Sequence, residues 1–447
     1  MSSSMQDYFY KLAGDLFDSL QGDEILLLEF SGEDSDFVRL NHNRIRQAGQ
    51  VVQRTLSLDL IAGARDAHGR HAMASVELCG RMEQDFKQLS SLLESMREQR
   101  ALLPEDPYLY FSDEIKNTEY HHDNEVVSSQ HALEQITQGA GDTDLVGIFA
   151  NGIQYAGFAS SIGQRNWHSS ATFNFDWSCY LTKDKAVKNN YAGFEWQPEV
   201  LASKMDSARY QLAILSRPAK TIEPGEYRAY LSPSALNEII GMMAWGGFGL
   251  KSHRTSNTPL MKMVEEGLTL SGDVSLREYH GRGLAPRFTG SGFIKPDEVS
   301  LIEAGHYQDC LVSARSAKEY GQAVNADYEY PGALDMAAGS LSQDDVLAAL
   351  GTGLYINNLW YLNFTDRNNC QLTGMTRFAC FWVEDGEIVA PVNVMRFDDS
   401  VYSLLGDSLI GLTAERELLL DSSTYGQRSS HSIELPGALV SSLKLTL

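Results

Sequence analysis

The residues best suited to chemistry lie between Asn237 and Met242. Glu238 carries a carboxylate that could ligate a metal ion or act as a general base. Its neighbours in this segment, an asparagine amide and a methionine thioether, are poor zinc ligands, because zinc prefers imidazole and thiolate donors. By residue type, Asn237, Glu238 and Met242 are therefore not the ligand set of a zinc site.

The element that must position these side chains is a helix that begins at Ser232-Pro233. Serine is a favoured N-cap residue, and proline suits the first helical position because its missing N–H costs nothing there. The segment Asn237-Glu238-x-x-Gly241-Met242 then resembles a metallopeptidase helix, His-Glu-x-x-Gly-His, with both histidines replaced. Taken alone, the same residues also form an ordinary apolar helix start, so the wider sequence must decide.

Composition and charge disfavour some classes of binding partner. The chain has 447 residues, with 36 Lys plus Arg against 59 Asp plus Glu and a net charge of -23. This acidic balance disfavours binding to phosphate backbones and anionic lipids, so we expect neither nucleic acid nor a membrane surface as partner. Residues 1–20 lack the pattern of a signal peptide, and five scattered cysteines indicate reduced thiols. We therefore expect a cytoplasmic protein.

Changes in pattern along the chain predict three units of an α+β protein. Residues 1–103 combine helical stripes with alternating strands. Residues 104–220 contain the dipeptide Asn151-Gly152, which is typical of a hairpin turn. Residues 221–447 are mostly strand and turn, with a second hairpin expected at Glu384-Asp385-Gly386. We thus expect an N-terminal and a middle α/β domain, followed by a strand-rich C-terminal domain.

Two segments are rich in aromatic residues. Residues 169–182 alternate so that their aromatic side chains share one side, which predicts a strand with one buried, aromatic face. Residues 355–364 are aromatic at many positions, and two interpretations stay open. The segment is either a strand within the core, or a strand that lines a cleft or an interface, where aromatic residues are enriched.

The third unit also contains an ordered series of short motifs. They are Leu301-Ile302-Glu303-Ala304-Gly305 with Arg315 after it, Gly353-Leu354-Tyr355-Ile356-Asn357, Leu372-Thr373-Gly374, and Glu384-Asp385-Gly386-Glu387-Ile388 followed by Pro391-Val392. In this order they resemble the third-domain landmarks of the TldD/PmbA family, once called modulators of DNA gyrase. The specificity lies in the series rather than in any single motif, and the layout of the first two units also fits that family.

The resemblance implies an activity and a partner. Active TldD members are similar to zinc peptidases in which one helix carries two histidines and a glutamate, and a cysteine near the C-terminus is the third ligand. Here Asn237 and Met242 take the histidine positions and Tyr425 aligns with the cysteine, which implies that this chain binds no metal. The pattern matches the PmbA branch of the family, also called TldE, which pairs with a zinc-bearing TldD subunit.

On this basis we expect the non-catalytic subunit of a zinc metallopeptidase complex that acts in peptide maturation and proteolysis. The chain itself would hold no cofactor, its TldD-like partner would hold the zinc, and an extended peptide would be the substrate. Glu238 would remain as a general base with no metal-bound water to activate. Two alternatives stay open: an active metallopeptidase with unrecognised ligands, and a non-proteolytic peptide-binding scaffold, which could be a homodimer.

Overall fold

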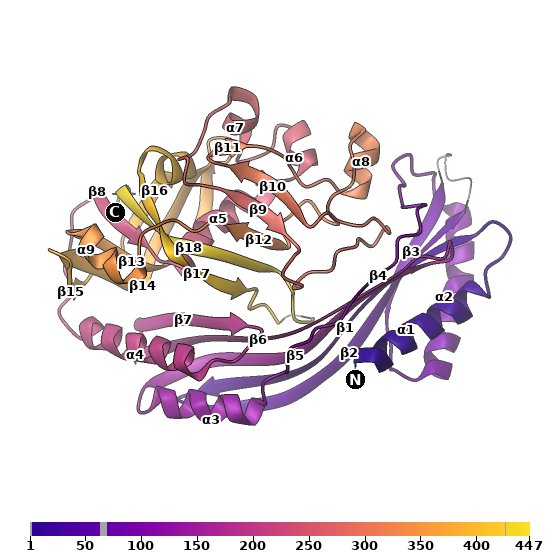
Figure 1. The fold of residues 1–447 in the computed structure, drawn as a ribbon, viewed down its shortest axis with the longest axis horizontal. Coiled ribbons are helices and arrows are strands. Elements are labelled where there is room, and N and C mark those ends of the chain that lie inside the picture. The colour runs from indigo at the N-terminus through magenta and orange to yellow at the C-terminus, as the bar shows by residue number, and fades with distance from the viewer. Residues whose placement is uncertain (1, 63–68, 425) are drawn as a thin grey trace.

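The fold is built on two large β-sheets, one packed above part of the other (Figure 1). The computed structural model describes residues 2–62, 69–424 and 426–447. Within these ranges, seven strands form the first sheet and eleven form the second. The fold is α+β, as predicted, and its C-terminal half is rich in strands. No helix in the described ranges is long and apolar enough to cross a membrane.

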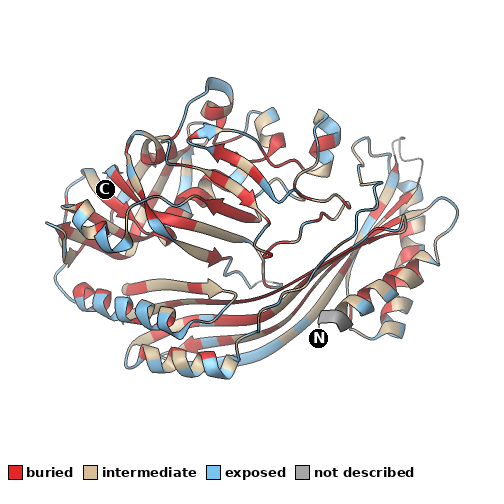
Figure 2. Cartoon of the chain, in the orientation of Figure 1, coloured by how far each residue is buried: buried red, intermediate tan, exposed pale blue. Residues whose placement is uncertain are grey.

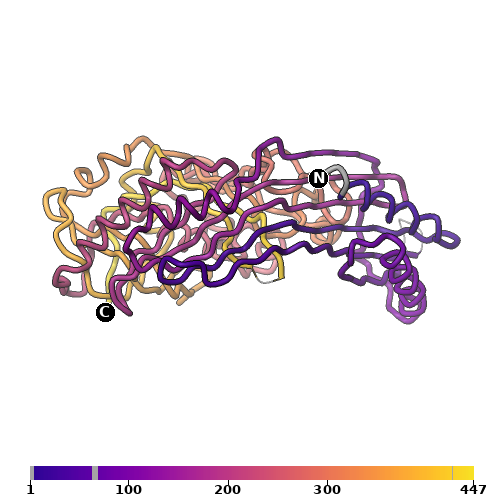
Figure 3. Tube along the Cα trace, turned by 90° about the horizontal axis from the view of Figure 1, so that it is seen from below, coloured from indigo at the N-terminus to yellow at the C-terminus, as the bar shows by residue number. Residues whose placement is uncertain are grey.

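The first sheet takes its strands from both sides of residue 103. In chain order they are β1 (Ile25–Asn41), β2 (Arg44–Ala62), β3 (Arg70–Glu77), β4 (Thr118–Tyr120), β5 (Asp144–Ser160), β6 (Arg165–Thr182) and β7 (Lys185–Gly193). Their order in the sheet is β3-β2-β1-β5-β6-β4, and β7 pairs with β6. Figure 3 shows these strands running along the length of the molecule. The predicted units 1–103 and 104–220 thus share one sheet, and the division of the chain into three domains stays a prediction.

Helices cover one face of this sheet (Figure 1). They are α1 (Ser2–Phe17), α2 (Met82–Leu102), α3 (Ser129–Ala140) and α4 (Pro198–Leu215). The alternation of β6 explains this, because its odd-numbered residues, such as Phe173 and Trp177, are buried in a core shared with α3 and α4. The even-numbered residues are polar and face the second sheet, and Thr172 and Asn174 among them are also buried. Figure 2 shows that buried residues prevail in the part of the first sheet that lies under the second. The predicted aromatic face is confirmed, and the opposite, polar face is covered as well.

The hairpin predicted at Asn151-Gly152 is wrong, because both residues lie within the continuous strand β5. This strand pairs with β1 on one side and β6 on the other, and the two long ladders override the local turn preference. The side chain of Asn151 donates to the Val127 carbonyl at 2.6 Å and accepts from Ser129 at 2.9 Å. Glycine is required at 152 because its φ is 143° and a Cβ there would lie 2.2 Å from the Asp34 carbonyl oxygen.

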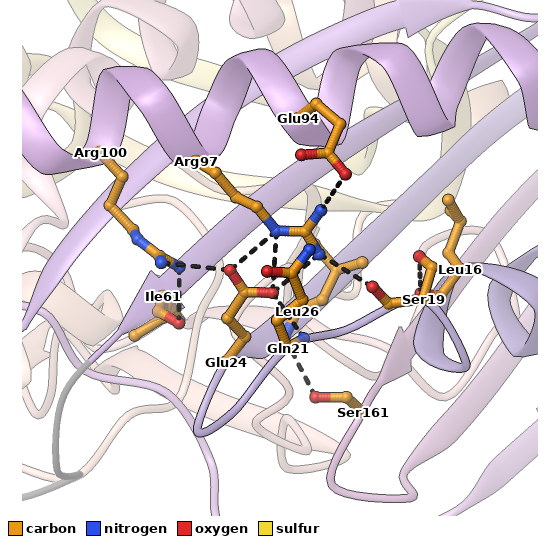
Figure 4. A network of polar contacts seen from close by, with 10 residues as sticks. All are labelled: Leu16, Ser19, Gln21, Glu24, Leu26, Ile61, Glu94, Arg97, Arg100 and Ser161. Carbon is orange, nitrogen blue, oxygen red and sulfur yellow. Dashed lines mark hydrogen bonds and ion pairs between the residues drawn. The ribbon is translucent and has the colours of Figure 1, made fainter.

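An ion-pair network holds α2 against the start of the sheet (Figure 4). Glu24, just before β1, accepts hydrogen bonds from Arg97 Nε at 3.0 Å and from Arg100 at 3.2 Å, both on α2. Arg97 also donates to the Ser19 carbonyl at 2.9 Å, which ties the end of α1 into the network. Burial acts to raise the pKa of Glu24, but the hydrogen bonds from Arg97 and Gln21 outweigh it and lower that pKa.

The second sheet and its short helices begin at Gly225. The strands are β8 (Gly225–Leu231), β9 (Leu276–Tyr279), β10 (Glu298–Glu303), β11 (His306–Tyr307), β12 (Ala333–Met336), β13 (Gly353–Asp366), β14 (Gln371–Glu384), β15 (Glu387–Pro391), β16 (Arg396–Ser400), β17 (Leu409–Leu420) and β18 (Ser432–Leu445). The helices are α5 (Pro233–Gly247), α6 (Leu250–Arg254), α7 (Met261–Glu266), α8 (Ala314–Tyr320) and α9 (Val346–Leu350), with a 3₁₀ turn at Gln343–Asp345 and a π turn at Ser403–Asp407. The hairpin predicted at 384–386 joins β14 and β15 and is confirmed. Asp385 and Gly386 have φ values of 49° and 82°, as a primed turn requires.

The aromatic segment 355–364 lies in β13 and changes character halfway along. Ile356 and Leu359 are buried in the core of the second sheet. Trp360 and Tyr361, by contrast, are 45% and 75% exposed. The core interpretation therefore holds for the first half of the segment and is wrong for Trp360 and Tyr361.

Candidate cleft along helix α5

The helix predicted to begin at Ser232-Pro233 is α5. Ser232 Oγ accepts a hydrogen bond from the Ala235 backbone N–H at 3.2 Å, and Pro233 is the first helical residue. One side of the helix is buried in the core of the second sheet through Leu236, Ile239, Ile240 and Met243. Because this apolar side fixes the rotation of the helix, Asn237 and Glu238 lie on the side that faces away from the core.

A cleft of about 620 Å³ lies along that outer side. Most of its lining comes from α5, one end of the first sheet, and the two segments on either side of residue 425, and Tyr330, Pro331, Leu334 and Asn358 complete it. The lining residues include Asn237, Glu238, Gly241 and Met242 on α5, Asp176 on β6, residues 188–190 on β7, and residues 419–422 and 431–433. The structure thus brings the three predicted α5 positions into one cleft and places polar groups of the first sheet opposite them.

The charges of the cleft centre on Lys188. Its Nζ lies 3.7 Å from Oδ2 of Asp176. Burial raises the pKa of Asp176, and the charge of Lys188 opposes that rise. Partial desolvation likewise raises the pKa of Glu238, and Lys188 again opposes it. Glu238 on α5 and Lys188 on the first sheet thus line the same cleft.

One neighbouring amide adds an unsatisfied polar atom to the cleft wall. Asn190 pairs with Asp176 and so shares its face of the sheet, and its buried Oδ1 has no hydrogen-bond partner among the residues that the structure describes. The other end of the Asn190 amide donates to Oδ1 of Asn174 at 3.0 Å, which fixes its orientation. Buried polar atoms without a partner are costly, so a bound molecule or water that completes them would be stabilised.

The donors on α5 do not fit zinc. Asn237 offers an amide and Met242 a thioether, so Glu238 is the one strong metal ligand of the three. Across residues 2–62, 69–424 and 426–447, no three His, Cys, Asp or Glu side chains lie close enough together to hold a metal ion. Tyr425 lies outside the described residues, although Ser422 and His431 on either side of it line the cleft. The assignment of Asn237, Met242 and Tyr425 as replaced ligands stays a prediction.

Sequence reasoning missed the wall that the first sheet contributes. Asp176 lies on the polar side of β6, between the aromatic residues that were used to predict the strand. That alternation contained a usable signal, because the polar side of such a strand does not pack into the apolar core and is left for solvent or a ligand. Lys188 and Asn189 had no such signal, since their position depends on how β7 pairs with β6.

Comparison with known proteins places this architecture in a family. A profile described as the PmbA/TldA metallopeptidase C-terminal domain matches residues 224–447, which is half of the chain. The chain belongs to the PmbA/TldD family. The matched residues of this PmbA/TldD protein include α5 and the whole of the second sheet. A comparison with curated protein sequences finds no match.

Solved structures share the fold over the entire chain. TldE from Thermococcus kodakarensis superposes with a TM-score of 0.71 at 15% identity, covering 98% of this chain and 100% of its own. A protein from Thermotoga maritima, described as a candidate modulator of a DNA gyrase, gives 0.71 at 13% identity, covering 99% and 100%. A similarly described protein from Bacteroides thetaiotaomicron gives 0.70 at 15% identity, covering 100% and 98%. The fold of this PmbA/TldD protein is thus shared from the first sheet to the last strand.

Proposed function

We propose that this chain is a TldE-like, zinc-free subunit of a metallopeptidase complex that processes peptides in the cytoplasm. In this proposal a TldD-like partner holds the zinc, and the cleft along α5 binds an extended peptide. The observation that carries it is the chemistry of α5, which lines a cleft of about 620 Å³ with Asn237, Glu238 and Met242. These residues can hydrogen-bond and contact a peptide, but they are not a zinc ligand set.

Three further observations support the proposal. The family profile is described as a metallopeptidase domain, and a solved structure with the same fold is described as TldE. The cleft walls combine charged, amide and apolar groups, which suits a peptide with mixed side chains. All five cysteines are free, in keeping with a reducing compartment.

The test is a reconstitution with a zinc-bearing TldD-like protein from the same organism. The purified chain should contain far less than about one zinc per molecule, and it should not cleave an unstructured peptide on its own. The mixture of the two proteins should cleave it. Glu238→Gln in this chain should leave the rate of the mixture nearly unchanged, as should the control Glu387→Gln on the exposed β14–β15 hairpin.

Three outcomes would overturn the proposal. Stoichiometric zinc that is lost in Glu238→Gln, together with cleavage by the chain alone, would establish an active metallopeptidase with ligands that the α5 residues do not reveal. A drop of about 100-fold in the rate of the mixture with Glu238→Gln would make Glu238 a general base. Failure to associate with any TldD-like protein would favour the homodimeric scaffold instead.

A further inference from the structure

The cleft along α5 does not end at the helix. A second hollow of about 260 Å³ shares Asp176, Leu420, Asp421 and Ser422 with it and continues over the polar face of the first sheet. A third hollow, of about 580 Å³, shares Arg39 with the second and reaches the free edge of β2. The three hollows form one groove from α5 to the sheet edge, which we call the long groove.

The floor of the long groove follows one row of paired residues across five strands. Asn190 on β7 pairs with Asp176 on β6, which pairs with Ile148 on β5. Ile148 in turn pairs with Arg39 on β1, and Arg39 pairs with Gln47 on β2. Directly paired residues share a face of a sheet, so all five side chains lie on the floor. Four strand spacings of about 4.8 Å give a length of about 19 Å, enough for about six residues of an extended peptide at about 3.3 Å each.

The chemistry changes along this row. The α5 end carries the carboxylates of Glu238, Asp176 and Asp421, with Lys188 among them. In the middle, Ile148 is an apolar residue that is 40% exposed.

The far end carries two exposed arginines, Arg39 and Arg46, which line the third hollow. Their guanidinium groups make no hydrogen bond or ion pair to any residue that the structure describes. Asp144, at the start of β5, already pairs with His42, with 2.7 Å between its Oδ1 and Nδ1 of the histidine.

We propose that Arg39 and Arg46 form a carboxylate-binding subsite at the outer end of the long groove. The ligand is an extended peptide whose acidic group contacts the arginines while its other end lies against α5; this rests on the peptide-binding role proposed above. Local charge complementarity supports it, because two unpaired arginines line the outer hollow while the carboxylates of the groove lie at the α5 end. Guanidinium groups bind carboxylates through paired, charge-assisted hydrogen bonds, which fix both register and direction of the peptide.

The carboxylate could come from an acidic side chain or from the C-terminus of the peptide, and three peptides distinguish these sources. All are fluorescein-labelled octapeptides of one sequence. The first carries two glutamates near its C-terminal end and a C-terminal amide. The second has glutamines in their place and the amide, and the third has the glutamines and a free C-terminal carboxylate. Affinities for the purified full chain are measured by fluorescence anisotropy at low and at physiological salt.

We expect the glutamate or the free-carboxylate peptide to bind about tenfold more tightly than the glutamine amide, with a smaller advantage at higher salt. Arg39→Gln and Arg46→Gln should reduce that advantage to about threefold or less without weakening the glutamine amide. The control is Arg81→Gln, an exposed arginine just before α2 at the far end of the first sheet. It should leave all three affinities unchanged.

Equal affinities for all three peptides would overturn the subsite, as would an advantage that survives the Arg39→Gln/Arg46→Gln double variant. The subsite and the subunit role fail separately. Carboxylate preference without cleavage by the reconstituted mixture would keep the subsite and reject the peptidase complex. Cleavage by the mixture without carboxylate preference would keep the peptidase complex and reject the subsite.

Discussion

Arg428 joins the segment between β17 and β18 to the first sheet, and its replacement tests how that wall of the cleft is held. It lies in the segment between β17 and β18 and is only 5% exposed. Its guanidinium donates to the Thr172 carbonyl at 3.1 Å and Thr172 Oγ1 at 2.8 Å, and to the Gly152 carbonyl and Ser35 Oγ at 3.4 Å each. Its backbone N–H faces both carboxylate oxygens of Glu33 at 3.4 Å.

The expected loss of stability follows from the burial of the two charged side chains, Arg428 and Glu33. Glu33 is 1% exposed, and its Oε1 also accepts a hydrogen bond from Gln53 at 2.5 Å. Burial lowers the pKa of Arg428 to about 10, and the charge of Glu33 opposes that effect. Arg428→Met keeps much of the side-chain volume but removes the positive charge and the donors. It therefore leaves a buried carboxylate and several acceptors without compensation, at a cost of about 3–5 kcal/mol in the free energy of unfolding.

A double-mutant cycle in urea, followed by near-ultraviolet circular dichroism, measures this cost. Glu33→Gln in the Arg428→Met background should recover at least about 1 kcal/mol relative to the sum of the single variants, because the second change removes the uncompensated charge. Hydrogen exchange should show that residues 426–431 open more readily in Arg428→Met, since these contacts anchor that segment. A loss below about 1 kcal/mol, or additive effects within about 0.5 kcal/mol, would refute the reasoning.

Two further substitutions test the buried carboxylate of Glu29 and the exposed side chain of Trp360. Burial, and then the charge of Asp327, raises the pKa of Glu29 from 4.5 to about 7. The folded protein therefore keeps a proton that the unfolded chain releases, and stability should fall as pH rises from about 4.5 to about 7. Glu29→Gln should abolish that slope and stabilise the protein at pH 8 by up to about 3 kcal/mol, measured by urea titration at several pH values. Trp360→Ala should cost about 1 kcal/mol or less, since Trp360 is 45% exposed and its main partner is Arg377, 4.1 Å from the ring centroid. Sedimentation velocity should show weaker association if Trp360 anchors an interface, and unchanged association would reject that role.

The parts of the fold that the sequence predicted are those that local chemistry decides. Ser232 and Pro233 begin α5 because a cap and a proline act within one turn of helix. Asp385 and Gly386 turn the β14–β15 hairpin because both adopt positive φ at little cost. The Asn151-Gly152 prediction failed for the opposite reason, since ladders to two distant strands fix the backbone there.

The residues of the candidate site also differ in whether local sequence could predict them. Asn237, Glu238 and Met242 could be found because they share one helix. Asp176 and Arg39 lie 137 positions apart in the sequence and reach one groove only through the register of β1, β5 and β6. No local pattern encodes that register, because it depends on which strands become neighbours.

The two sides of α5 are under different constraints, and this bears on the proposal that the chain is a zinc-free subunit. Leu236, Ile239 and Met243 are buried in the core of the second sheet, so they decide where the helix lies. Asn237 and Glu238 face the cleft and contribute little to that core. Replacing residues on the cleft side therefore changes the chemistry of the groove without moving its wall. Under the function proposed above, a helix of this kind would keep the shape of the cleft while Asn237 and Met242 stand where a zinc peptidase would need metal-binding donors.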